Sequence, residues 1–207
     1  MTFMKRVYPA AFVGLVAVAG CMNTSTAAGV NQSSEQAASR QDVISFQSNP
    51  ISASGEVRFE AYVTGYSYWD NTPPGSAAIA YPVVHRTAGG TGTYQDPITL
   101  AVGHRIDGQR RSIDYPVGTR FYLENLRKYA IVEDLCGDGG RPQDGPCHAG
   151  YQGRPWLDIY VDGARSARSA SNTCMNKLTQ FHTVVQNPAP DYPVVAGALT
   201  ESGCQVF

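Results

Sequence analysis

The fold of this chain is decided by the stretch YPVGTRFYLENLRKYAIVEDLCGDG (residues 115–139) and, after a Gly/Pro-rich loop, by WLDIYVDG (residues 156–163). Two strand-like runs in this stretch each deliver one aspartate, Asp134 and Asp158. Both aspartates are flanked by residues that are expected to be buried. If the two strands pair in one small barrel, the two carboxylates meet at one place on its surface. This meeting point is the predicted functional site.

The composition favours a β-rich, turn-rich domain. The chain has 207 residues, of which 43% are apolar and 16% charged, with 21 Gly, 13 Pro and 12 Tyr. High Gly, Pro and Tyr with low charge favour strands and turns over helices. Six to eight short strands and one or two short helices are expected, which predicts a compact β-barrel or sandwich. The clearest runs are residues 57–69, 79–84, 98–104, 115–124, 129–136, 156–163 and 181–188 for strands and 164–180 for a helix, with a polar turn region at 104–114.

The N-terminus predicts export. Residues 1–20 combine a short basic region with an apolar run that is too short to span a bilayer. They end in Val18-Ala19-Gly20-Cys21, which resembles a bacterial lipobox and makes Cys21 the expected lipidation site. The alternative is a plain secretory signal cleaved near residues 27–28. The predicted location is therefore the cell envelope, lipid-anchored and outer-membrane-sorted, or the secreted fraction.

Residues 21–55 are predicted to form a disordered tether, because they are rich in Ser, Gln, Asn, Ala and Thr and nearly free of aromatic residues. The folded domain is expected over residues 56–207.

The cysteine count fits an oxidising compartment. If Cys21 carries lipid, Cys136, Cys147, Cys174 and Cys204 remain, and an even number there predicts two disulfides. Three connectivities are possible, and local closure favours Cys136–Cys147 and Cys174–Cys204. No CxxC pair is present, so no zinc site is predicted.

Charge and motifs exclude several function classes. The net charge is −1, or about −3 without residues 1–20, and there is no run of Lys or Arg, so no basic face and no nucleic-acid partner are expected. The glycines of the loop at 86–97 form neither GxGxxG nor a P-loop, and no GxSxG elbow occurs. No cofactor and no metal is predicted.

The motifs resemble those of double-psi β-barrel proteins over residues 58–163. The likeness is strongest to the three-aspartate domain of the membrane-bound lytic transglycosylase A family, and it extends to expansins and family-45 glycosidases. It rests on Gly65-Tyr66, on the P-x-G-T-x-F-Y strand at 116–122, on Asp134 before a Gly-rich turn, and on Leu157-Asp158-Ile159-Tyr160. The resemblance implies a six-stranded double-psi β-barrel, here with long disulfide-stapled loops. The family's first aspartate has no counterpart, because Gly103 stands at its expected position; Asp107 or Asp114 could substitute.

The two aspartates suit glycan chemistry. Cleavage of a glycosidic bond needs a carboxyl group that stays protonated near neutral pH. Asp158 lies between Leu157 and Ile159, so it is the predicted acid/base, with Asp134 as its partner. The alternative is that both carboxylates only satisfy backbone N–H groups. Glu133 alternates with Asp134 and is expected to be a solvated or paired surface acid on the other face.

Four aromatic residues are predicted to bind sugar: Tyr66, Tyr68, Trp69 and Trp156. The alternative for the Tyr66–Trp69 cluster is a core role at one end of the barrel. Two functions follow for the whole protein: an envelope enzyme that cleaves glycan, with peptidoglycan foremost, or a non-catalytic barrel that binds a cell-wall polysaccharide or a protein. An inhibitor or host-facing effector is a third and weaker possibility.

Overall fold

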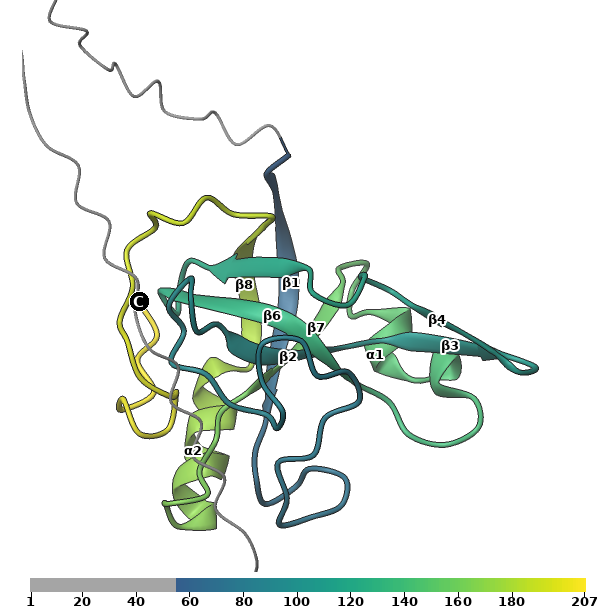
Figure 1. Cartoon of the computed structure of the whole chain (residues 1–207), viewed down its shortest axis with the longest axis horizontal. Helices are drawn as coiled ribbons and strands as arrows, with labels where there is room; N and C mark the ends of the chain where they lie inside the picture. Colours follow the sequence, from purple (N-terminus) through teal and green to yellow (C-terminus); the bar gives the residue numbers. More distant parts are fainter. Residues whose placement is uncertain (1–54) are drawn as a thin grey trace, which may run out of the picture. The chain divides into compact units, whose positions relative to one another are not determined.

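A computed structural model describes residues 55–207 of the chain. The predictions of a signal peptide, of lipidation at Cys21 and of a tether fall on residues 1–55, of which 1–54 lie outside the described residues. Six strands form a closed barrel in the spatial order β1-β7-β2-β6-β5-β8 (Figure 1). These strands are β1 (Val57–Tyr66), β2 (Ile98–Val102), β5 (Arg120–Leu123), β6 (Lys128–Leu135), β7 (Trp156–Tyr160) and β8 (Gln180–Gln186). The mainly β, six-stranded barrel predicted from the sequence is thereby confirmed.

The barrel mixes parallel and antiparallel pairs. β1 runs parallel to β7, and β2 runs parallel to β6. The remaining neighbours, β1–β8, β2–β7, β5–β6 and β5–β8, are antiparallel. Because the sheet closes on itself, no barrel strand is left with an unpaired edge. The parallel pairs require chain crossings, which bring residues far apart in the sequence onto neighbouring strands.

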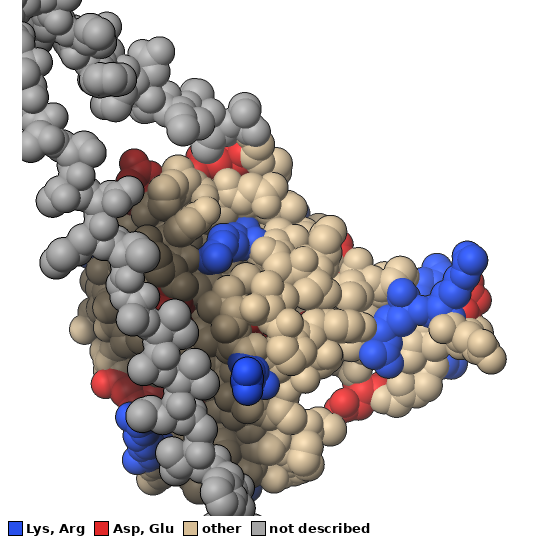
Figure 2. All heavy atoms as spheres, in the orientation of Figure 1, with Lys and Arg blue, Asp and Glu red and all other residues tan. Residues whose placement is uncertain are grey.

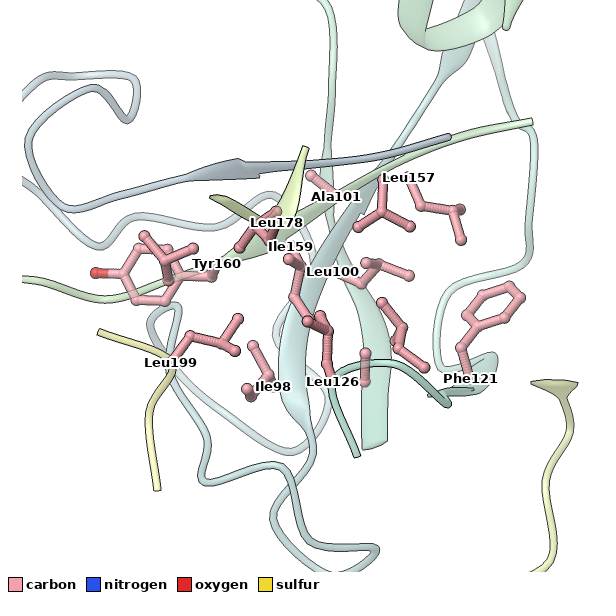
Figure 3. Packing of buried hydrophobic residues seen from close by; sticks show 14 of the residues in the cluster. Ile98, Leu100, Ala101, Phe121, Leu126, Leu157, Ile159, Tyr160, Leu178 and Leu199 are labelled. Carbon is pink, nitrogen blue, oxygen red and sulfur yellow. The ribbon is translucent and has the colours of Figure 1, made fainter. Parts of the chain in front are cut away.

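The barrel interior is filled by aliphatic and aromatic side chains. All five residues of β2 are buried, as are the first seven of β6. Side chains of β7 alternate, so that Leu157 and Ile159 are fully buried while Asp158 between them is only half-buried. Figure 3 shows Leu100, Leu157 and Ile159 packed together, with Leu126 and Phe121 nearby. Burial of this continuous cluster supplies the main stabilisation of the domain.

Helix α2 (Arg168–Leu178) covers part of β1. Gly65 on β1 permits the close approach, because a Cβ there would lie 2.9 Å from Val161 Cγ1 and 3.2 Å from Met175 Cγ. The disulfide Cys174–Cys204 ties this helix to the C-terminal segment, and Cys136–Cys147 closes the loop after β6. Both pairings favoured by the sequence are confirmed. Within residues 55–207, no helix is long and apolar enough to cross a membrane.

Two elements depart from the sequence prediction. Residues 104–114 were expected to be a turn region, but they form a separate two-stranded sheet of β3 (His104–Asp107) and β4 (Arg110–Ile113). This sheet extends from the barrel beside the short helices η1 (Pro142–Asp144) and α1 (Pro146–Ala149) (Figure 1).

Residues 79–84 were predicted as a strand, and that prediction is wrong. Most of their amides bond to the side-chain carboxylates of Asp134 and Glu133 and not to the backbone of a neighbouring strand. The Tyr81 amide donates to the Glu133 carbonyl oxygen, and the amides of Val83 and Val84 donate to its carboxylate. Backbone donors that are satisfied by carboxylates need no hydrogen bonds from a neighbouring strand.

Candidate functional site

A pocket of about 260 Å³ opens where four barrel strands meet two loops. The strands contribute Tyr66, Ala101, Asp134, Leu135 and Asp158; the loop after β1 contributes Asp70, Asn71 and Thr72; and the loop after β6 contributes Cys136, Gly137 and Asp138. The pocket therefore collects four carboxylates from three separate parts of the chain. The two aspartates singled out in the sequence both line it.

The strand register explains why the two aspartates meet. Ala101 on β2 pairs with Asp134 on β6 and with Asp158 on β7, while Asp158 also pairs with Thr64 on β1. Residues paired across neighbouring strands project from the same face of a sheet. Asp134 and Asp158 thus flank Ala101, whose small side chain leaves the space between them open.

Asp158 is oriented by a two-step hydrogen-bond chain. The Trp156 Nε1–H donates to Thr64 Oγ1 over 2.8 Å, and Thr64 Oγ1 donates to Asp158 Oδ1 over 2.6 Å. Because the indole N–H is only a donor, the Thr64 hydroxyl hydrogen is directed at the carboxyl group. Asp158 Oδ2 accepts no hydrogen bond from the described residues and lies 3.9 Å from the disulfide sulfur Cys136 Sγ. Oδ2 is therefore the oxygen available for a proton or a ligand.

The environment of Asp158 favours its neutral form. Burial raises the pKa of this carboxyl from 3.8 to about 7, the hydrogen bond from Thr64 opposes the rise, and the charges of Asp70 and Asp134 add to it. A carboxyl group with this pKa is partly protonated at neutral pH and can exchange a proton in either direction.

Asp134 is held much more tightly than Asp158. Its Oδ1 accepts from the amides of Ala80 (3.1 Å) and Leu135 (2.9 Å), and its Oδ2 accepts from the Tyr66 hydroxyl (2.9 Å). Only 8% of the residue is exposed. Burial raises the pKa of Asp134, although the three hydrogen bonds oppose that rise. Both oxygens of this carboxylate are thus engaged by the protein itself.

Asp70 is a third carboxylate in the pocket, and the sequence analysis missed it. It lies in the loop after β1, is exposed, and its Oδ1 accepts from both the amide (2.7 Å) and the hydroxyl (2.5 Å) of Ser67. From the sequence, Asp-Asn-Thr-Pro-Pro-Gly at residues 70–75 indicates only a loop. The available signal was its place four residues after Tyr66, where a loop leaving β1 has to pass over the barrel end.

Neither Asp107 nor Asp114 lines this pocket, so neither replaces the first aspartate of the three-aspartate domain. Asp107 lies on the β3–β4 hairpin. Asp114 lines a second pocket of about 400 Å³, where its Oδ1 lies 2.6 Å from His148 Nδ1. Position 103 has no room for an aspartate, because any Cβ there would collide with the Asp114 carboxylate and with the Cys147 carbonyl oxygen.

The predicted sugar-binding aromatic residues do not share one surface. Tyr66 is buried and lines the first pocket. Tyr68 and Trp69 are half-buried and pack edge to face, with centroids 5.4 Å apart, and the Trp69 Nε1–H donates to the Gly163 carbonyl oxygen over 2.9 Å. Trp156 lines the second pocket. Trp156 also belongs to a separate aromatic cluster, which it forms with Tyr62, Tyr151 and Phe181.

A family model described as the DDB_G0273701 N-terminal domain matches residues 58–205. The chain belongs to this family. The uncharacterized protein DDB_G0273701/DDB_G0273221 of Dictyostelium discoideum is 31% identical over 145 residues, which cover 70% of this chain and 57% of the relative. The chain thus spans little more than half of that relative's length. No solved structure matches the chain.

The match to the DDB_G0273701 N-terminal domain covers the entire barrel from Arg58 onward, including every residue that lines the first pocket. Among residues 55–207 of this domain, no group of three or more His, Cys, Asp and Glu side chains is arranged to hold a metal ion. The four cysteines of this range are paired in disulfides. The polar groups that line the pocket are the carboxyl groups of Asp70, Asp134, Asp138 and Asp158, the Tyr66 hydroxyl, and the side chains of Asn71 and Thr72.

Glu133 corrects one expectation from the sequence. A register shift between Leu100 and Ala101 interrupts the alternation of β6 just before Asp134, so alternation does not place the two acids on opposite faces. Glu133 is fully buried and is not a solvated surface acid. Its Oε1 accepts from the amides of Val83, Val84 and His85, and its Oε2 contacts Thr99 Oγ1 and His85 Nδ1. Burial alone would raise the pKa of Glu133, but these hydrogen bonds outweigh it and lower the pKa. Glu133 thereby fastens the loop whose Ala80 amide binds Asp134.

Proposed function

We propose that the pocket cleaves a glycan chain, with Asp158 as the acid/base. The observation that carries this proposal is one oriented carboxyl group with a pKa of about 7 in an open pocket, its Oδ2 without a protein donor. Structural carboxylates are usually saturated by donors, as Asp134 is. A half-buried carboxyl group that is kept partly protonated and left accessible has the properties of a general acid.

In the proposed reaction, the proton on Asp158 Oδ2 passes to the glycosidic oxygen. The bond between that oxygen and the anomeric carbon breaks, and the leaving sugar departs as an alcohol. The anomeric carbon is then attacked either by a hydroxyl group of its own sugar, which returns its proton to Asp158 and leaves an anhydro product, or by water. For attack by water, Asp70 is the second carboxylate, because it lines the same pocket and its Oδ2 accepts no hydrogen bond from residues 55–207.

Asp134 is assigned a positioning role in this scheme. Its three hydrogen bonds hold the Tyr66 hydroxyl and the loop at Ala80 at the pocket wall, and its charge raises the pKa of Asp158. Asp134→Asn would keep the acceptor for the Tyr66 hydroxyl on one atom but weaken this charge effect. We therefore expect a partial loss of activity and a lower apparent pKa of Asp158.

We also propose that the barrel is of the double-psi type. A closed six-stranded barrel with two parallel pairs is compatible with the double-psi barrel of the three-aspartate, expansin and family-45 glycosidase domains. Two disulfides in a domain of this size favour an envelope or secreted location. Lipidation of Cys21 is proposed as the means of anchoring, and loss of membrane association in Cys21→Ser would support it.

The decisive experiment compares wild type, Asp158→Asn and Asp191→Asn on purified peptidoglycan sacculi and on a panel of soluble β-glycans. Asp191 is exposed and lies outside the pocket, so its variant controls for loss of one carboxylate. Released fragments are quantified by chromatography and mass spectrometry, which also separates anhydro products from hydrolytic ones. The proposal predicts release by wild type and Asp191→Asn and none by Asp158→Asn. Equal release by all three proteins, or no release from any substrate, would contradict it.

The second function is a non-catalytic barrel that binds a cell-wall polysaccharide or a protein. It is favoured by the saturation of Asp134, because a purely structural site would use its carboxylates in that way. In this case wild type and Asp158→Asn would both be retained on sacculi without releasing fragments. Trp69→Ala would abolish retention if the Tyr68–Trp69 surface makes the contact.

A further inference from the structure

The β3–β4 hairpin is an arm that adds no strand to the barrel. Its residues pair only with each other, from His104 with Ile113 to Asp107 with Arg110. In Figure 1 it projects from the barrel next to α1. Most of its side chains are exposed, so the hairpin buries little apolar surface. Its residue types are therefore not dictated by the packing of the core.

Three arginines gather on this arm. Arg105, Arg110 and Arg111 are all exposed, and none forms an ion pair with a residue in 55–207, whereas Arg58, Arg141 and Arg154 each have a carboxylate partner. Figure 2 shows the basic side chains covering the projecting end of the molecule, with acidic atoms beside them. Asp107, paired with Arg110, is the one acidic residue of the hairpin. The surface between these side chains is hollowed to about 490 Å³. Arg105 and Arg110 lie on one face of the hairpin and Arg111 on the other, so the arginines cluster on the arm without forming one basic face.

The arm is braced against the loop closed by Cys136–Cys147. The Gln143 side chain accepts from the Ile106 amide over 3.2 Å and donates to the Ile106 carbonyl oxygen over 3.1 Å. At the base of the hairpin, the Asp114 amide donates to the Gly103 carbonyl oxygen over 3.0 Å. These bonds hold the arm in a defined direction, although it packs against no barrel strand to any great extent.

We infer that this arm binds the carboxylate groups of an acidic polysaccharide whose chain passes through the Asp158 pocket. The inference rests on the proposed function. β2 leads directly from Ala101, beside Asp158, into β3, so Arg105 lies roughly 13 Å further along the chain at about 3.3 Å per residue. Guanidinium groups match carboxylates with two parallel hydrogen bonds. The arm thus holds the charged part of a substrate a few sugar units away from the scissile bond.

An acidic glycan fits this surface better than a nucleic acid. DNA-binding proteins commonly neutralise on the order of 6–10 phosphates, whereas the arm offers three arginines and one aspartate. Asp70, Asp134, Asp138 and Asp158 line the pocket at the base of the arm, and they would repel a continuous row of phosphates. A polysaccharide with spaced acidic groups can place a neutral stretch in the pocket and its carboxylates on the arginines.

The test measures binding separately from cleavage. The variant R105Q/R110Q/R111Q is compared with R165Q/R168Q/K177Q, which removes the same charge from exposed positions around α2. Binding to polygalacturonate and to alginate is measured by biolayer interferometry at about 0.05 M and about 0.3 M salt, since screening shortens the reach of exposed charges. Methyl-esterified polygalacturonate is the neutral control. We expect roughly tenfold weaker binding of either acidic polymer by the arm variant, wild-type affinity for the α2 variant, and weak binding of the ester.

Several outcomes would overturn the inference. These are equal affinities of the two triple variants, an affinity for the ester equal to that for the acid, and no binding of either acidic polymer by wild type. Tighter arm-dependent binding to duplex DNA or to anionic lipid vesicles would assign the arm to another partner. Asp158→Asn is included because it removes cleavage and leaves the arm intact. If it has no effect on cleavage while arm binding persists, the proposed function fails and the docking surface stands.

Discussion

Replacing Asp158 by asparagine should stabilise the folded protein, and increasingly so as the pH rises. Asparagine has the shape of the protonated carboxyl group and retains an oxygen that accepts from Thr64, without the charge that burial penalises. The native pKa of about 7 lies above the ordinary value of 3.8, so between these values the folded state binds more protons than the unfolded state. The free energy of unfolding contributed by Asp158 therefore falls as the pH rises from about 4 to 7.

The size of the effect follows from that pKa. A rise from 3.8 to about 7 corresponds to a cost of at most about 4 kcal/mol for the ionised form at pH 8. Because the residue is half-buried, solvent screening reduces this cost, and we expect about 2 kcal/mol. For a domain of this size, that corresponds to an increase in Tm of about 4–8 °C.

The assay is urea unfolding of wild type, Asp158→Asn and Asp191→Asn at pH 4, 6 and 8, followed by tryptophan fluorescence. The stability difference between Asp158→Asn and wild type should be near zero at pH 4 and largest at pH 8, while Asp191→Asn should follow wild type throughout. A stabilised variant without activity is the pattern expected when a buried charge serves chemistry at the expense of stability. Destabilisation by Asp158→Asn at pH 8, or a difference that does not change with pH, would refute the argument.

Three further predictions follow from the contacts around the pocket. Glu133→Gln should lower the free energy of unfolding by about 2 kcal/mol, because an amide cannot accept from every donor that the carboxylate satisfies; amide exchange in residues 79–85 should rise with it, and unchanged exchange would count against the role of this residue as a clamp. Thr64→Val should raise the apparent pKa of Asp158 in a pH–rate profile, since the lost hydrogen bond lowers that pKa in wild type; an unmoved profile would remove Thr64 from the site. The double variant Cys136→Ser/Cys147→Ser should lose about 3 kcal/mol by the loop-entropy model for a separation of 11 residues, and it should lose activity because Cys136 lines the pocket; urea unfolding and fragment release measure the two effects.

Much of the fold could be predicted because local patterns carry it. The alternation around Asp158 and the apolar run of β6 reflect which side chains face the barrel interior, and that depends on the two-residue period of a strand. The two disulfide pairs could be predicted from the even number of cysteines and from their spacing in the chain. The pattern at residues 79–84 misled, because a strand and a loop fastened by carboxylates can have the same apolar composition.

The candidate site was predicted in part. Asp134 and Asp158 could be selected because each interrupts a buried strand. Asp70 could not, since it lies in an irregular loop whose path depends on the elements it crosses. Thr64 was missed for another reason: its role depends on the parallel pairing of β1 with β7, which joins residues that are 94 positions apart.

By itself, the sequence determined that the domain is mainly β, that its cysteines pair locally, and that two aspartates stand in apolar strands. Each of these properties depends on residues close together in the chain, so composition, spacing and alternation are sufficient to reveal them. Only the tertiary structure decided that Asp134 is saturated by donors while Asp158 keeps one oxygen free, and that Asp70 joins them. It also decided that Glu133 is buried and that three arginines share one arm. These properties depend on strand register and loop paths, which bring distant residues into contact and set the solvation of each charge.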